Sequence, residues 1–303
     1  YTEENTLSLH DALPISIGSL VWAAQVFGEP EWLELARAAG EAIWATHWAD
    51  GVLRRTSRGG AASDVAGFAE DYGAVASGYA HLAGALGDPT WLSRAETILD
   101  AALPLFGAGD GGFHDAAAGD LFERPREIAD NPTPSGTSAL IEALRLVGAL
   151  AQRPDFVERA DAAASTTWGA VARNPRFAAS ALGDLLMADE ARRGLRPAVA
   201  VVVDAGAEPI TPASRAVWRM APAGTAVLRG VPGQAGFGDW FDARGVREPG
   251  EYPLAKPLGA AEDEYDEHDD VATGGTVYVC RGETCFAPAS SVKEIRAALW
   301  QRA

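Results

Sequence analysis

Large apolar residues recur in steps of three and four along residues 65–86, and the positions between them are mostly alanine, glycine and serine. The apolar positions are Phe68, Tyr72, Val75, Tyr79, Leu82 and Leu86. This spacing places them on one face of a helix, because an α-helix repeats every 3.6 residues. Small residues on the other faces allow neighbouring helices to approach closely. The pattern therefore predicts a helix that is buried on more than one side.

A shorter pattern recurs three times and predicts helical hairpins. Pro30, Pro89 and Pro154 each precede an aromatic residue by two positions and an alanine by six. Proline suits the first turn of a helix, where its missing N–H has no intrahelical partner. The predicted helices span 17–27, 30–48, 65–86, 89–106, 134–150, 154–172 and 175–193. We expect them to stack as hairpins, with the first helix of each pair inside and the second outside.

The pattern changes after Gly194. Short, β-branched apolar runs at 198–203, 225–231 and 276–280 predict strands, and the segments 212–220 and 291–301 predict helices. The expected fold class is therefore mainly α, with a region of about three helical hairpins at 17–195 and a small α/β subdomain at 196–303. Residues 1–16 contain TLSLHDALPI, which looks like a translated sequencing adapter. We expect this stretch to be an artefact at the start of a truncated fragment.

Composition and net charge exclude some classes of protein. The chain has 303 residues, 48% of them hydrophobic, and a formal net charge of -17. Such a charge repels nucleic-acid phosphate and anionic lipid, so we expect no nucleic-acid or membrane partner and a cytoplasmic location. No apolar run is long enough to span a bilayer. With two cysteines and no phosphate-binding glycine motif after the strands, we expect neither a metal site nor a cofactor.

The connections between hairpins, residues 49–64 and 107–133, are longer than those within hairpins. Loops of this length are uncommon unless they are functional, and both are expected at the same end of the helix pairs. Glu70 and Asp71 open a helix beneath the first loop, where a carboxylate is a candidate general acid or base on a sugar. The alternative is that both residues simply favour the positive end of the helix dipole. His81 is interpreted as a packing histidine.

The loop 107–133 carries further candidates. Residues 113–115 and 120–124 are predicted to pair as a β-hairpin. This would present Phe113, His114, Asp115 and Arg124, a mixture of aromatic and charged groups that suits a polyol or sugar. An equally weighted interpretation is that Arg124 and Arg126 form ion pairs that hold the loop in place.

The end of this loop is predicted to begin a helix, with Thr133 as its N-cap and Pro134 at its first position. Backbone amides near Ser135 and Gly136 would then be available to a substrate hydroxyl. Water or the cap itself can satisfy the same amides. Arg54, Arg55 and Arg58 lie on the other long loop and could add positive charge at the same end. Arg54 is taken as a further candidate for substrate binding, although arginines on exposed loops are usually only solvated.

Several motifs resemble the C-terminal region of the thioredoxin-domain-containing, spermatogenesis-associated protein 20 family. They are Gly51-Val-Leu-Arg-Arg55, Gly67-Phe-Ala-Glu-Asp-Tyr72, Gly111-Gly-Phe-His-Asp115, Glu123-Arg-Pro-Arg126, Asp130-Asn-Pro-Thr-Pro-Ser-Gly136 and Val277-Tyr-Val-Cys280 with Cys285. The resemblance implies a six-hairpin α/α toroid like that of N-acylglucosamine 2-epimerases and glycosidases, and it adds Tyr72 to the candidate substrate-binding residues. It also implies an upstream thioredoxin-like domain as a partner in the full-length parent. Six hairpins at this period need about 360 residues, so we expect a partial toroid.

The two cysteines and the function remain open at this point. Cys280 and Cys285 are redox candidates, but their spacing is not Cys-x-x-Cys, and a structural pair, thiol or disulfide, is preferred. The leading hypothesis is a carbohydrate-active toroid of epimerase or hydrolase type with a small-molecule carbohydrate as its ligand. The alternative is a non-catalytic scaffold or redox-accessory module for the thioredoxin-like domain. A third is a fragment with no activity of its own.

Overall fold

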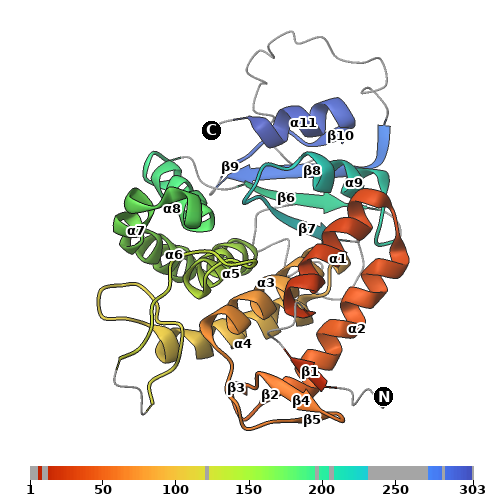
Figure 1. Ribbon diagram of the computed structural model, residues 1–303. Coiled ribbons are helices and arrows are strands. Elements are labelled where there is room, and N and C mark those ends of the chain that lie inside the picture. Colours follow the sequence, from red (N-terminus) through yellow and green to blue (C-terminus); the bar gives the residue numbers. More distant parts are fainter. Residues whose placement is uncertain are drawn as a thin grey trace.

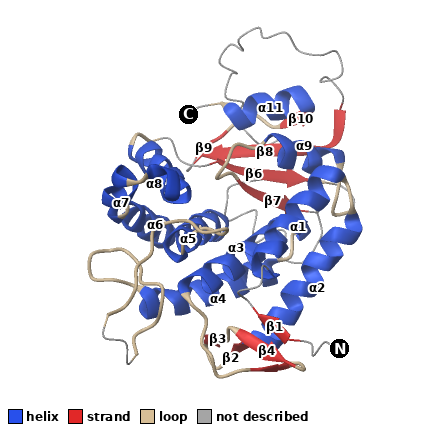
Figure 2. Cartoon of the chain, viewed as in Figure 1, coloured by secondary structure: helices blue, strands red, loops and turns tan. Residues whose placement is uncertain are grey.

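The computed structural model describes residues 6–8, 13–119, 123–194, 198–204, 208–230, 272–281 and 284–301. Helices dominate the first two thirds of the chain, and a small mixed layer of strands and helices follows (Figures 1 and 2). The expected fold class is confirmed: the chain is mainly α, a partial α/α toroid of helical hairpins followed by a small α/β subdomain.

Three hairpins build the toroid fragment. They are α1 (Leu13–Phe27) with α2 (Pro30–His47), α3 (Ala69–Leu86) with α4 (Pro89–Phe106), and α5 (Gly136–Ala151) with α6 (Pro154–Thr166). After them come the short α7 (Trp168–Arg173), the 3-10 turn η1 (Pro175–Phe177) and α8 (Ala179–Arg192). Helix α3 packs between α1 and α5, so these three first helices form an inner row (Figure 1). The prolines do open α2, α4 and α6.

The inner row is tightly packed because its facing residues are small. A Cβ on Gly73 of α3 would lie 2.5 Å from the backbone carbon of Ala139 in α5, which is too close for any side chain. Large side chains lie on the opposite side of α3, where Tyr79 is buried and contacts Trp91 of α4 at a ring distance of 5.2 Å. The sequence pattern of one apolar stripe and one stripe of small residues thus places α3 at the centre of the helical core.

The α/β subdomain covers one end of the inner row. Strands β6 (Ala198–Val203) and β7 (Ala226–Gly230) are parallel and are joined through α9 (Pro212–Met220). On the other edge of β6 lies the antiparallel β8 (Ala272–Arg281), which also pairs with β9 (Thr284–Cys285) and β10 (Ala289–Ser291). Helix α11 (Val292–Trp300) follows β10. Helix α3 contacts β7 through Gly84, whose missing side chain leaves room for the carbonyl of Val227.

The first long connection forms strands that the sequence pattern does not predict. They are β2 (Trp48–Ala49), β3 (Val52–Leu53), β4 (Thr56–Arg58) and β5 (Ala61–Ala62), and β1 (Thr6–Ser8) pairs with β4. Helix α3 consequently begins at Ala69 rather than at residue 65. The buried His47 fixes this region, because its two ring nitrogens contact the carbonyl of Arg54 and the hydroxyl of Ser57. The expectation that residues 1–16 are an artefact concerns the origin of the sequence and stays a prediction.

The β-hairpin expected in the second long connection lies partly outside the described residues, since one of its two runs includes residues 120–122. Among the described residues, Phe113 makes a bridge with Gly107, and the amide of Asp115 donates to the carbonyl of Pro125. Arg124 also holds the loop, because its guanidinium donates to the carbonyls of Leu105 and Ala116.

Candidate functional site

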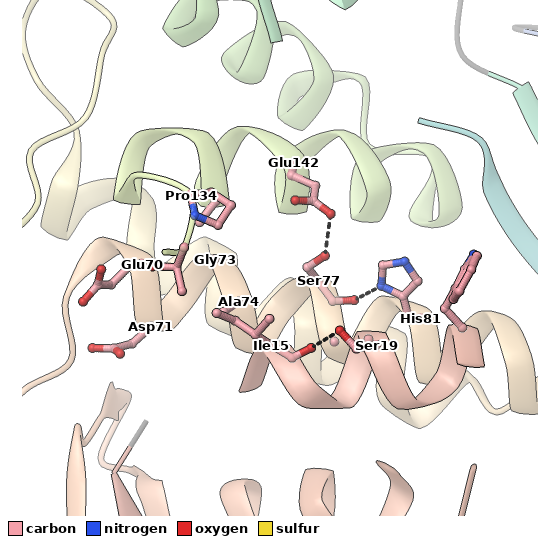
Figure 3. A pocket seen from close by; sticks show the side chains of 15 residues that line it. Ile15, Ser19, Glu70, Asp71, Gly73, Ala74, Ser77, His81, Pro134 and Glu142 are labelled. Carbon is pink, nitrogen blue, oxygen red and sulfur yellow. Dashed lines mark hydrogen bonds between the residues drawn. The ribbon is translucent and has the colours of Figure 1, made fainter. Parts of the chain in front are cut away.

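A cavity of about 360 Å³ lies on the inner row of helices, and all three of them contribute to its walls (Figure 3). Helix α1 supplies Ser19 and Trp22, α3 supplies the line from Glu70 through Ser77 to His81, and α5 supplies Glu142. The loop before α5 adds Pro134. We call this space the first cavity. It lies at the starts and along the flanks of inner helices, which is where the long connections suggested a site.

Glu70 and Asp71 occupy the first turn of α3 but differ in their surroundings. The Asp71 side chain is 1% exposed, and its carboxylate accepts a hydrogen bond of 2.8 Å from the amide of Phe68. This is the contact of a residue that caps its own helix. Glu70 is 34% exposed and pairs with the guanidinium of Arg55 at 2.7 Å. Glu70 thus lies at one end of the cavity with its carboxylate turned to Arg55 and away from Ser77 and Glu142, while Asp71 caps the helix (Figure 3).

The arginine that reaches Glu70 is Arg55, not the neighbouring Arg54. Arg55 is 11% exposed, pairs with Glu70, lies 3.7 Å from Asp71 and has its guanidinium 4.2 Å from the ring centre of Phe68. Arg54 donates instead to the carbonyl of Asp64 within its own loop. The sequence names both arginines as sources of positive charge but does not show which of the two faces α3. Neighbouring side chains of an extended backbone point to opposite sides, so only one of the two arginines can face α3.

Tyr72 and Phe113 are core residues in this structure. The hydroxyl of Tyr72 accepts a hydrogen bond of 2.9 Å from the amide of Leu53, and its ring contacts Phe106 edge-on. Burial raises the pKa of the Tyr72 hydroxyl. Phe113 is fully buried with the guanidinium of Arg159 4.1 Å from its ring centre. Neither side chain lines the first cavity.

His114 and Asp115 connect the second loop to α3. The carbonyl of Asp115 accepts from the amide of Ala69, and its carboxylate accepts from the amide of Glu127. Burial raises the pKa of the Asp115 carboxyl, and the nearby Glu127 and Glu70 raise it further. The amide of His114 donates to the carbonyl of Phe106. Arg124 holds the loop through the backbone carbonyls of Leu105 and Ala116 rather than through the expected ion pair. Arg126 does form an ion pair, with Asp110 at 2.7 Å.

Ser135 and Gly136 form the start of α5, two residues later than expected. Ser135, not Thr133, is the N-cap, and its hydroxyl accepts from the amide of Ser138. A Cβ on Gly136 would lie 3.1 Å from that of Ala69. The glycine therefore accommodates α3 rather than leaving an opening for a ligand.

The sequence patterns do not single out Trp22 or Glu142, which line the first cavity, and they give His81 a packing role. Trp22 is 49% exposed on the cavity wall. The available signal was its position three residues after Ser19, on the polar side of α1. A 2.8 Å contact between Nδ1 of His81 and the carbonyl of Ser77 fixes the orientation of the imidazole ring. The centre of this ring lies 5.9 Å from that of Trp218. These are packing contacts, yet His81 also lines the cavity.

The groove continues past His81 into a second cavity of about 320 Å³. His81, Pro134 and Glu142 line both cavities. The second cavity is bounded by α5, by α8 and by residues 223–225 of the α/β subdomain. The two cavities together form one groove, which runs along the inner row towards the subdomain.

Cys280 and Cys285 lie away from this groove. They form a disulfide between β8 and β9, where they are directly opposite each other in the strand register, and neither lines a cavity described above. Whether the pair has a redox role stays a prediction. Within the described residues, no three His, Cys, Asp or Glu side chains gather as a metal site, and no helix is long and apolar enough to cross a membrane.

Comparison with known proteins gives remote structural likenesses. No protein-family model matches the chain, and no curated protein matches it. Among solved structures, cellobiose 2-epimerase from Bacillus thermoamylovorans is 11% identical with a TM-score of 0.45, covering 54% of this chain and 44% of that one. D-mannose isomerase is 18% identical with a TM-score of 0.43, covering 53% and 41%. An unsaturated glucuronyl hydrolase from a Bacillus species is 17% identical with a TM-score of 0.41, covering 53% and 45%.

The chain thus spans less than half the length of the solved structures it resembles. TM-scores below 0.5 do not assign a function. The resemblance to the spermatogenesis-associated protein 20 family and its upstream thioredoxin-like domain stays a prediction from the sequence motifs.

Proposed function

We propose that the groove binds a carbohydrate and that the chain is part of a carbohydrate-active protein of epimerase or hydrolase type. The observation that carries the proposal is the first cavity. An exposed aromatic ring, Trp22, stands there beside hydrogen-bonding side chains of two other inner helices, Ser77 and Glu142. Binding sites for small molecules are commonly concave and mostly apolar, with a few converging polar groups.

Each part of this lining suits a sugar for a physical reason. The faces of sugar rings carry C–H groups, which pack against the flat, electron-rich face of a tryptophan. The ring edges carry hydroxyls, which need both donors and acceptors. Ser77 supplies a hydroxyl, Glu142 supplies carboxylate acceptors, and the two side chains lie 3.4 Å apart. The groove therefore offers one apolar platform and a polar wall.

Glu70 is the proposed acid–base group. Glu70 lines one end of the first cavity, and its carboxylate is one third exposed and paired with Arg55. Ser77 lies seven residues further along α3, about 10 Å along the helix axis, and it contacts Glu142. The carboxylates of Glu70 and Glu142 therefore stand well beyond the roughly 5 Å of a retaining glycosidase pair. This spacing favours a mechanism in which Glu70 moves a proton and Glu142 orients the ring.

Titration calorimetry with a panel of mono- and disaccharides tests the proposal. We expect Trp22→Ala to weaken sugar binding about tenfold, because the ring loses its platform. Glu70→Gln keeps the shape of the side chain but removes the acid–base group. We therefore expect this variant to bind the sugar and to lose catalytic activity on it. Trp32→Ala is the matched control, since Trp32 is 37% exposed on the outer helix α2. Equal binding by the Trp22→Ala and Trp32→Ala variants would refute the proposed platform.

A further inference from the structure

The two cavities of the groove meet at shared residues. The first cavity measures about 360 Å³ and the second about 320 Å³, and His81, Pro134 and Glu142 line both. Binding sites for small molecules usually measure about 300 to 1,000 Å³, so each cavity alone lies near the lower limit of that range. A cavity of this size suits a ligand of one ring. The two cavities together therefore suit a ligand of two linked rings.

The second cavity offers a sugar ring the same two kinds of contact as the first. Leu146 of α5 and Met187 of α8 supply apolar surface for the C–H groups of the ring. Ser180 of α8 and Thr225 of the α/β subdomain supply hydroxyls. Neither hydroxyl has a hydrogen-bond partner among the described residues, and both residues are half-buried rather than sealed from solvent. Because a hydroxyl both donates and accepts, these two side chains can pair with the hydroxyls of a neutral sugar.

Three helices fix the imidazole of His81 where the cavities meet. On its own helix, Nδ1 lies 2.8 Å from the carbonyl of Ser77. The ring packs beside Trp218 of α9, at 5.9 Å between ring centres. On α1, Gly18 gives the ring its room, since a Cβ there would stand 3.4 Å from Nδ1. His81 thus has one position in the groove.

The contact with Ser77 also decides which nitrogen of His81 can accept a hydrogen bond. A carbonyl oxygen only accepts, so the proton of the neutral ring is on Nδ1 and the lone pair is on Nε2. Nε2 has no hydrogen-bond partner among the described residues and is not closed off from solvent. The second ring nitrogen is directed away from Ser77 (Figure 3). His81 therefore presents an acceptor at the point where one cavity passes into the other.

We propose that the groove binds two linked sugar rings, one in each cavity, and that Nε2 of His81 accepts a hydrogen bond from a hydroxyl beside the linkage. The inference rests on the proposed carbohydrate function and names its substrate class, a neutral disaccharide or longer chain rather than a single sugar. The second ring gains its own apolar and hydroxyl contacts. A ligand without a hydroxyl beside the linkage leaves Nε2 unpaired, so His81 contributes selectivity.

Calorimetry on the full chain at pH 7.5 tests the second subsite with three probes: glucose, maltose and cellobiose. The two disaccharides contain the same rings in different linkage geometries, and we expect one of them to bind at least about tenfold more tightly than glucose. Gly183→Phe adds a ring to the wall of the second cavity, where a Cβ would meet nothing within 4 Å. This variant should bind the disaccharide only as tightly as glucose, with its affinity for glucose unchanged. Leu182→Phe is the matched control, because Leu182 is the neighbouring exposed residue and does not line the cavity.

Two substitutions separate the two nitrogens of His81. In His81→Asn, the amide nitrogen takes the place of Nδ1 and can still donate to Ser77, but no acceptor remains at the place of Nε2. In His81→Gln, the longer side chain brings an amide oxygen near the place of Nε2. We expect His81→Asn to weaken disaccharide binding about tenfold and His81→Gln to retain most of it. Equal melting temperatures would show that both variants are folded alike.

The outcomes distinguish this inference from the proposed function. If glucose binds and neither disaccharide binds more tightly, or if Gly183→Phe keeps the preference for the disaccharide, the two-ring subsite is overturned and the sugar groove stands. Equal losses of disaccharide affinity in His81→Asn and His81→Gln would overturn the role of Nε2. If none of the three sugars binds, the carbohydrate proposal falls and the two-ring subsite falls with it.

Discussion

The two ends of the groove use carboxylates in opposite ways. At the end where α3 begins, Asp71 satisfies a backbone amide and Glu70 is paired with its own arginine. At the end that faces the α/β subdomain, Arg145 pairs with both Asp161 and Asp184, and the hydroxyl of Ser138 hydrogen-bonds the carboxyl of Asp184. The first arrangement stabilises a helix terminus and orients a side chain. The second holds a buried acid whose pKa burial raises to about 7 in spite of these partners.

The hydrogen-bond and ion-pair partners of a carboxylate, more than its position beside a cavity, indicate whether it has a structural or a chemical role. Asp71 looks like a catalytic candidate in the sequence, yet its contacts are those of a cap. Asp184 has no motif around it, yet its surroundings leave its ionisation close to neutral pH. Three tests, taken from the largest expected effect to the smallest, examine this contrast between the two ends of the groove.

Removal of Arg145 is expected to have the largest effect on stability. Arg145→Ala leaves the buried carboxylate of Asp184 and that of Asp161 without their shared cation, so the free energy of unfolding should fall by about 4 kcal/mol. Arg55→Ala should cost about 2 kcal/mol, because Glu70 is one third exposed and water can replace the lost hydrogen bonds. Urea denaturation of both variants measures the difference. A larger loss of unfolding free energy in Arg55→Ala than in Arg145→Ala would contradict the proposed contrast between the two ends of the groove.

Asp184→Asn is expected to change how stability depends on pH. The pKa of Asp184 is about 7 in the folded state, above the ordinary value of 3.8, so the folded state binds the proton more tightly. Stability contributed by this group is therefore present at low pH and is lost as pH rises from about 4 to about 7. The variant lacks this loss, so its stability relative to the parent should increase by on the order of 3 kcal/mol over that window.

Thermal unfolding at a series of pH values measures this difference, with Asp189→Asn as the control. Asp189 is exposed and paired with Arg193, so its replacement should leave the pH profile of the parent unchanged. Parallel profiles for the parent and the Asp184→Asn variant would mean that the acid is not held close to neutrality.

Local patterns in the sequence predict where the helices lie, but they do not predict which residues cap the helix ends or contact them. The repeated prolines locate α2, α4 and α6, and the continuous apolar runs locate β6 and β7. Both signals are local, because they depend on residues that are neighbours in the chain. The start of α5 at Gly136 and the strands around residues 48–62 depend on contacts with distant residues, such as those of His47 with Arg54 and Ser57.

The same limit applies to the groove. The long connections meet the end of α3 where Glu70 lines the first cavity. Trp22, Glu142 and Asp184 come from three different helices, and nothing in their local sequence shows that they border one groove. Sequence reasoning also chose Phe113 and Tyr72, which are buried, because aromatic residues in a binding motif and in a core have the same composition.

Two glycines at opposite ends of the groove provide the mildest test. Gly183 lies inside α8, in the wall of the second cavity, and a Cβ there would meet nothing within 4 Å. Gly183→Ala should raise the free energy of unfolding by about 0.7 kcal/mol, because alanine loses less backbone entropy on forming a helix. Gly136→Ala should lower it by about 1 kcal/mol, since the new methyl group would crowd Ala69 and the amide of Glu70 at 3.1 and 3.2 Å. Melting temperatures that shift by about 2 °C in opposite directions would show that the start of α3 is closely packed and the α8 wall is open. A shift in the same direction for both variants would show that the two walls are packed alike.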